Sequence, residues 1–162
     1  MYIIIPAYEP DKRLIQVVQD ITIKLPKARI IVVNDGSGPG YNDYYDETAF
    51  IGATVLTHPI NKGKGAALKT AFAHIQEEVV SQHLSAQPIV TVDSDGQHLI
   101  KDIVRVAKAI EENPSHLVLG ARAFVGKVPA RSRFGNKVTA GLFRLVTGQK
   151  VTDTQTGLRG MS

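Results

Sequence analysis

Short apolar runs alternate along the chain with longer segments in which apolar residues recur every three or four positions. Residues 2–7 are an unbroken apolar run, whereas Leu14, Val17, Val18 and Ile21 fall on one side of a helix. The first pattern is typical of a buried strand and the second of an amphipathic helix. Together they predict helices that begin near residues 10, 41, 65 and 100, and strands at 2–7, 29–33, 53–57, 88–92 and 117–121.

This alternation predicts the fold class, an α/β domain with a mostly parallel central sheet and helices on both faces. In such sheets, ligands bind outside the carboxyl ends of the strands. The loops that follow the predicted strands are rich in polar side chains, which should therefore meet at one edge of the sheet. These side chains are Tyr8, Glu9, Asp35, Lys62, Lys64, Asp93, Asp95 and Arg122.

Length and composition narrow the class of protein. The chain has 162 residues, 43% of them hydrophobic, so we expect one domain over residues 1–162. The lack of cysteine excludes disulfides, thiolate metal sites and a cysteine nucleophile. A net charge of +4 suits an anionic ligand but is too small to indicate nucleic acid.

The two ends of the chain carry further expectations. Residues 1–6 predict a strand rather than a signal peptide. No apolar run approaches the roughly 20 residues of a membrane-spanning helix. Residues 156–162 show no finished element, so we expect the full-length protein to continue past them.

Two acids, Asp93 and Asp95, directly follow the predicted strand at 88–92. In an extended segment, both carboxylates point to the same side and reach one hard cation, Mg²⁺ or Mn²⁺. Gln97 offers a further oxygen. The alternative is a solvated turn before a helix, because Asp, Ser and Gly are common turn residues.

The loop at residues 61–65 carries Lys62 and Lys64, which with a divalent cation suit a diphosphate or triphosphate. Its glycine spacing fits neither a Walker A loop nor a dinucleotide fingerprint, which argues against an ATPase and a dehydrogenase. The histidines show no paired ligand spacing, and we expect them at the surface or at helix caps, without a role. They are His58, His74, His83, His98 and His116.

Six motifs in order resemble family 2 glycosyltransferases, over residues 2 to about 160. They are 5–8 (IPAY), 33–37 (VNDGS), 61–65 (NKGKG), 93–97 (DSDGQ), 120–122 (GAR) and 153–157 (DTQTG). The motifs at 93–97 and 153–159 are most similar to those of dolichyl- or polyprenyl-phosphate sugar synthases.

The resemblance implies a GT-A fold, a nucleoside diphosphate sugar donor and inversion at the anomeric carbon. It implies a cation held by Asp93, Asp95 and Gln97, and catalytic roles for Asp95 and Asp153. The base stays open, because Asn34 and the Glu9-Pro10 pair depart from the usual family pattern. The nucleotide-sugar-binding residues that it implies are Pro6, Ala7, Tyr8, Glu9, Asp35, Lys64, Asp93 and Ser94.

The acceptor follows from charge. A lipid monophosphate has a second pKa of about 6, so it is largely dianionic and needs no general base. Arg122, Arg131 and Arg133 form a basic segment suited to clamp this phosphate, and the alternative is a solvated basic loop. Asp153 then orients the acceptor or the sugar, whereas a hydroxyl acceptor would require Asp153 as the base.

Apolar and basic residues interleave over 131–146, which predicts an amphipathic helix on a bilayer surface or, alternatively, one packed on the sheet.

From the motifs, the charge and the acids together, we expect a metal-dependent hexosyltransferase of the cell envelope that glycosylates a polyprenyl phosphate. We expect it on the cytoplasmic side, soluble as this chain and membrane-associated at full length. The alternatives are a relative that glycosylates a saccharide hydroxyl and a non-catalytic nucleotide-sugar binding module.

Overall fold

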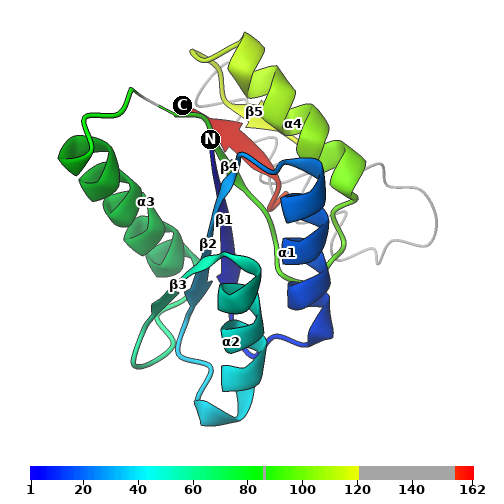
Figure 1. Ribbon diagram of the computed structural model, residues 1–162, viewed down its shortest axis with the longest axis vertical. Coiled ribbons are helices and arrows are strands. Elements are labelled where there is room, and N and C mark those ends of the chain that lie inside the picture. Colours follow the sequence, from blue (N-terminus) through cyan, green and yellow to red (C-terminus); the bar gives the residue numbers. More distant parts are fainter. Residues whose placement is uncertain (86, 121–155) are drawn as a thin grey trace, which may run out of the picture.

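The computed structural model describes residues 1–85, 87–120 and 156–162. Within them, one sheet has the strand order β3-β2-β1-β4-β6-β5, with helices around it (Figure 1). The strands are β1 (Tyr2–Ala7), β2 (Arg29–Asn34), β3 (Thr54–Thr57), β4 (Ile89–Thr91), β5 (Val118–Leu119) and β6 (Arg159–Met161). The helices are α1 (Lys12–Lys24), the short 3₁₀ helix η1 (Pro39–Tyr41), α2 (Asn42–Ile51), α3 (Lys64–Ser81) and α4 (Ile100–Glu112).

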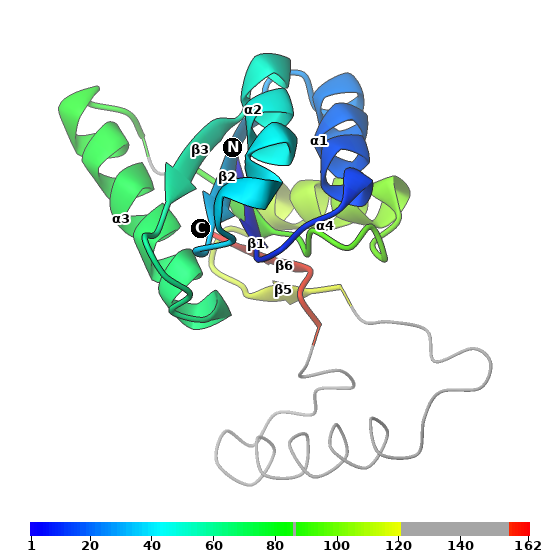
Figure 2. The ribbon, with the colours of Figure 1, turned by 90° about the horizontal axis from the view of Figure 1, so that it is seen from below.

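Helices cover both faces of the sheet, as the alternating pattern predicts. Figure 2 shows α3 on one side and α1, α2 and α4 on the other. Successive β1 residues point to opposite faces, so Ile3 and Ile5 pack in the core with α1 and α4. Ile4 packs with Ala67 and Ala71 of α3 instead. An unbroken apolar strand is therefore required at the centre of the sheet. None of the helices in the described ranges is long and apolar enough to span a bilayer.

The neighbours of β1 separate at the carboxyl edge. β1 pairs in parallel with β2 along its whole length, but with β4 only over Tyr2 to Ile4. The Val92 N–H still donates to the Ile4 carbonyl, at 2.9 Å. Because alternate residues of a strand face the same neighbour, Pro6 turns its missing N–H toward the side that β4 has left. We call the carboxyl ends of β1 and β4, where the strand order reverses, the switch point.

Residues 156–162 contain the strand β6, so the expectation that they hold no finished element was wrong. This strand lies between β4 and β5 and is antiparallel to both, which makes the sheet mixed. Three residues are too few to show an apolar run or an alternation. Gly160 in β6 lets α4 approach, since a β carbon there would lie 2.9 Å from Val106 Cγ1.

Candidate active site

A small pocket lies at the carboxyl edge, where the loops after β1, β2 and β3 meet. Its volume is about 160 Å³. The structure thus brings together five of the residues predicted to bind a nucleotide sugar. The pocket is lined by Pro6, Ala7, Tyr8, Asp35, Asn61, Gly63 and Lys64.

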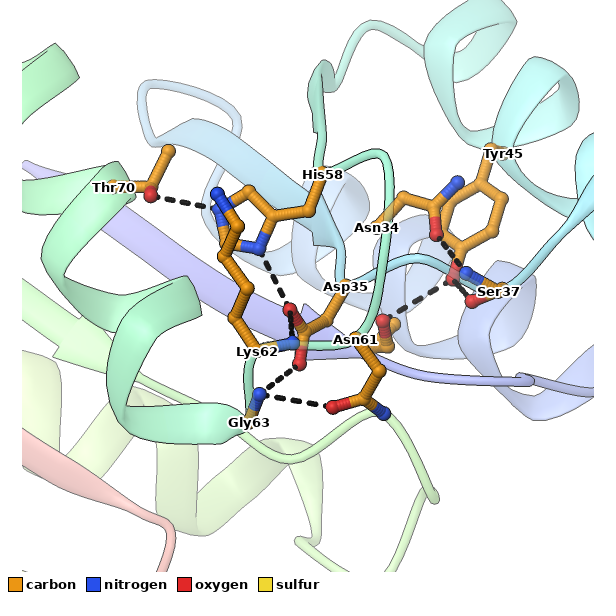
Figure 3. Close-up of polar contacts among 10 residues, drawn as sticks. Asn34, Asp35, Ser37, Tyr45, His58, Asn61, Lys62, Gly63 and Thr70 are labelled. Carbon is orange, nitrogen blue, oxygen red and sulfur yellow. Dashed lines mark hydrogen bonds and ion pairs between the residues drawn. The ribbon is translucent and has the colours of Figure 1, made fainter.

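Asp35 is a buried residue of the pocket lining, and its carboxylate accepts hydrogen bonds from the protein itself (Figure 3). Its Oδ1 lies 2.6 Å from His58 Nδ1 and accepts the Lys62 N–H at 3.0 Å, and its Oδ2 accepts the Gly63 N–H at 2.8 Å. Burial alone would raise the pKa of Asp35, but these hydrogen bonds outweigh burial and lower it. The carboxylate therefore stays charged and holds the loop between β3 and α3.

The expectation that every histidine lies at the surface or at a helix cap was wrong for His58 and His98. His58 is 6% exposed, and its Nε2 lies 2.8 Å from Thr70 Oγ1. The His98 side chain is 8% exposed, and its Nε2 lies 3.2 Å from Asp93 Oδ2. One signal for His58 was available in the sequence, since it directly follows a predicted strand at the polar edge.

The loop after β2 is fastened by its own polar side chains. Asn34 accepts the Ser37 N–H at 2.9 Å, so its amide faces into the loop. Ser37 Oγ accepts the Glu9 N–H at 2.9 Å and lies 2.6 Å from Tyr45 Oη. The Tyr45 hydroxyl also donates to the Ala7 carbonyl at 3.2 Å. These contacts couple the loops after β1 and β2 and hold Glu9 at its positive φ of 46°.

Tyr8 and Glu9 extend outward from these loops. Tyr8 is 49% exposed at the pocket rim. A hydrogen bond with Glu9 is the main cause that raises the pKa of Tyr8. Glu9 is not among the pocket-lining residues. Its predicted contact with the nucleotide sugar therefore stays a prediction.

Asp93 forms the other side of the switch point. It pairs with the Lys64 ammonium through Oδ1 and contacts His98 through Oδ2. The hydrogen bond from His98 is the largest cause that lowers the pKa of Asp93, burial opposes it, and Lys64 lowers it further, to about 2. Gly157 lies against the same carboxylate. Lys64 and Asp93 thus join the loop after β3 to the loop after β4.

Asp93 and Asp95 do not lie in an extended segment, so the expectation that an extended backbone points both carboxylates to the same side was wrong. The chain turns at Ser94 and Asp95, and Asp95 Oδ1 accepts the Gln97 N–H at 3.0 Å. Gly96 supports the turn with a φ of 70°. The predicted turn is therefore present, and the cation site stays a prediction.

The described ranges contain no group of three acidic, histidine or cysteine side chains that could hold a metal ion. Asp93 and Asp95 nevertheless have the donor chemistry of a hard-cation site. Asp93 is ionised at neutral pH, since its pKa is about 2. Oxygen atoms from other sources, such as the Gln97 amide or a phosphate, would have to complete the coordination shell.

The predicted residues Arg122, Arg131, Arg133 and Asp153, and the amphipathic segment at 131–146, lie outside the described residues. The residues that flank 121–155 are in place. Thr156 Oγ1 donates to the Gly120 carbonyl at 2.7 Å, and the Gly120 N–H donates to the Leu158 carbonyl at 2.9 Å. Thr91 Oγ1 donates to the Gly157 carbonyl at 2.7 Å. Gly120 and Thr156 are therefore hydrogen-bonded to each other, and the adjacent Gly157 is hydrogen-bonded to β4.

This edge, with a pocket at the strand ends and acids after β4, is the arrangement that the GT-A class predicts. The sequence model described as glycosyl transferase family 2 matches residues 2–161, so the chain belongs to that family. The predicted family and the predicted GT-A fold are both confirmed.

Curated relatives carry names from lipid-linked sugar transfer. The chain is 30% identical over its whole length to a UDP-N-acetylglucosamine–dolichyl-phosphate N-acetylglucosaminyltransferase of Methanococcus voltae, of which it covers 69%. It is 27% identical over 97% of its length to a dolichyl-phosphate beta-glucosyltransferase of Trichomonas vaginalis, covering 51% of that protein. It is 26% identical over 97% of its length to polyprenol monophosphomannose synthase of Mycolicibacterium smegmatis, covering 59%. The chain thus spans between half and about two thirds of these relatives.

A solved structure supports the fold. The mannosyltransferase PcManGT from Pyrobaculum calidifontis, solved with GDP-Man and Mn²⁺, superposes with a TM-score of 0.53 at 20% identity. The match covers 73% of this chain and 34% of that one. At this identity, the likeness concerns the fold alone.

Proposed function

We propose that this chain is the catalytic domain of an inverting, metal-dependent glycosyltransferase. It moves a sugar from a nucleoside diphosphate sugar to a polyprenyl phosphate. The observation that carries the proposal is the contact of Lys64, which lines the pocket, with Asp93 across the switch point. A pocket lysine in contact with a proposed cation-binding acid suits a bound diphosphate.

The donor lies along the pocket in this proposal. Pro6, Ala7 and Tyr8 contact the nucleoside, and Lys64 contacts the phosphates. Asp35 has three donors from the protein, and a carboxylate has about four acceptor positions. One position is left for a base or ribose donor. Asp35 therefore serves the nucleoside and the loop together.

Asp93, Asp95 and Gln97 would hold Mg²⁺ or Mn²⁺. The bound cation would stabilise the negative charge that develops on the departing diphosphate. The chain's own contribution is to keep Asp93 ionised and fixed in place, by means of His98 and Lys64. Ser94, between the two acids, would face the donor.

The acceptor is proposed to be a lipid phosphate. Such a phosphate attacks without a general base, because it is largely dianionic above its second pKa of about 6. The names of the curated relatives support this choice. We assign the acceptor clamp to Arg122, Arg131 and Arg133 and an orienting role to Asp153. The residues that flank this segment, Gly120 and Thr156, are hydrogen-bonded to each other.

Donor binding tests the proposal most directly. Thermal unfolding of the purified chain is followed with UDP-, GDP- and dTDP-sugars, with and without MnCl₂. We expect at least one donor to raise the unfolding temperature in a metal-dependent way. An unfolding temperature that no donor changes would contradict the proposal. Tight binding without release of nucleoside diphosphate, when polyprenyl phosphate is added, would indicate a binding module. Release only with a saccharide acceptor would indicate a hydroxyl-directed enzyme.

Two further measurements test the metal and membrane parts of the proposal. Asp95→Asn should abolish turnover, whereas the same exchange at Asp46, an exposed acid of α2, should not. Flotation with liposomes of anionic lipids tests the membrane surface, to which the net charge of +4 is suited. A chain that never floats would contradict that part alone.

A further inference from the structure

His58 is a buried histidine to which the proposed function assigns no role. It lies between two other elements of the fold, with Nδ1 2.6 Å from Asp35 Oδ1, after β2, and Nε2 2.8 Å from Thr70 Oγ1, in α3 (Figure 3). Both ring nitrogens are engaged, so the ring is fixed in one orientation. His58 therefore connects the end of β2 to α3.

The direction of these hydrogen bonds follows from charge. The pKa of Asp35 is lowered, so its carboxylate is ionised and only accepts. His58 Nδ1 must then carry the proton and donate to Asp35. In the neutral ring, Nε2 accepts the Thr70 hydroxyl proton. Thr70, His58 and Asp35 are thus joined by two consecutive hydrogen bonds, and the one at Nδ1 is directed at the carboxylate.

The Asp35 carboxylate also holds a backbone segment at the pocket. It accepts the N–H groups of Lys62 and Gly63, at 3.0 and 2.8 Å. The next residue, Lys64, is the first of α3 and reaches Asp93. Gly36 allows this close packing, because a β carbon there would overlap the backbone at Ile60 and Asn61. The direction in which Lys64 leaves the loop therefore depends on Asp35, and the orientation of Asp35 depends on His58.

We propose that His58 is a positioning residue for the donor diphosphate. Through Asp35 it holds the backbone of Lys62 and Gly63, and so directs Lys64 toward the switch point. The inference rests on the proposed function, since it assigns Lys64 to the diphosphate. Without the His58 donor, the Asp35 side chain is free to rotate, and the loop that carries Lys64 loses its fixed place.

A pair of variants of equal size separates hydrogen bonding from packing. In His58→Asn, the amide N–H takes the place of Nδ1–H and still donates to Asp35, whereas His58→Leu donates nothing. Calorimetric titration with UDP and with GDP, in MnCl₂, measures the dissociation constant. We expect about tenfold weaker binding for His58→Leu, the size of a lost hydrogen bond to a charged group. His58→Asn should stay within about threefold of the wild type. His74→Leu, at a half-buried histidine of α3, is the matched control and should bind normally.

A double-mutant cycle with Lys64→Met tests whether His58 acts through Lys64. If it does, adding His58→Leu to Lys64→Met weakens binding by much less than tenfold. Equal binding by wild type and His58→Leu would overturn the inference, as would equally weak binding by the Leu and Asn variants.

If His58→Leu does not fold, Thr70→Val takes its place and should weaken binding by a smaller factor. Binding by Thr70→Val that equals that of the wild type would overturn the inference. Wild-type protein that binds neither UDP nor GDP is titrated with dTDP, and binding of none of the three would instead overturn the proposed function.

Discussion

Gly157 lies against Asp93 so closely that a β carbon on Gly157 would overlap the Asp93 carboxylate. The contact joins the loop after β4 to the residues before β6, and the hydrogen bond from Thr91 to the Gly157 carbonyl, at 2.7 Å, holds it. The glycine of the late family motif therefore makes room for a proposed cation ligand.

Gly157→Ala should displace the Asp93 carboxylate and disable the cation site. We expect a loss of metal-dependent turnover of about 10²-fold, the usual effect of misplacing a catalytic group by about 1 Å. Steady-state assays over a range of MnCl₂ concentrations measure it. Gly40→Ala is the control, since a β carbon at Gly40 meets nothing within 4 Å. Equal activity in both variants would contradict the prediction.

The contact between Lys64 and Asp93 should make stability depend on pH. The folded-state pKa of Asp93 is about 2, below its ordinary 3.8. A lowered carboxyl pKa stabilises the protein above the ordinary value, and this stability is lost as the pH falls through the folded value. Lys64→Met should therefore lower the free energy of unfolding by up to about 1 kcal/mol near neutral pH, since Lys64 is half exposed.

That difference should shrink as the pH falls from about 4 toward 2. Urea unfolding without metal, at several pH values, measures it. Lys69→Met, an exposed lysine of the same helix, provides the comparison. A Lys64→Met effect that stays constant with pH would show that the ion pair does not contribute.

Tyr45→Phe should destabilise the fold and loosen the loops at the pocket. Tyr45 is 4% exposed, and its hydroxyl contacts both Ser37 and the Ala7 carbonyl. The Ala7 carbonyl keeps the Asp35 N–H as a donor, and Ser37 Oγ keeps the Glu9 N–H. The buried Ser37 hydroxyl proton loses its acceptor, which costs about 1–3 kcal/mol. Chemical denaturation provides the test, with Tyr44→Phe on the same helix as the reference. Identical midpoints for the two variants would refute the role of this hydroxyl.

Asp153→Asn distinguishes the two classes of acceptor. With polyprenyl phosphate as acceptor, the variant should lose less than about 10²-fold in rate, because a dianionic phosphate needs no base. Assays with a lipid phosphate and with a saccharide, side by side, make the comparison. Complete loss with the phosphate would favour a hydroxyl acceptor and a general base at Asp153.

Local pattern was sufficient for most of the fold. An apolar run such as residues 2–7 specifies a buried strand by itself, and the spacing of Leu14, Val17 and Ile21 specifies an amphipathic helix. The alternation of the two specifies a parallel sheet, and the order of the motifs specifies the family. The polar residues after each strand also indicated which edge carries the site.

The tertiary structure decided the partners of the site residues. Asp35 faces inward, because it is held by His58, which follows β3, and by the amides of Lys62 and Gly63. Thr91 and Gly157 are 66 positions apart, and no periodicity in the sequence indicates such a contact. The same holds for β6, whose three residues pair with β4 and β5 on either side. The sequence by itself determined the family and the elements other than β6, since these depend on local spacing and on the order of the motifs. Only folding determined β6 and which buried groups meet.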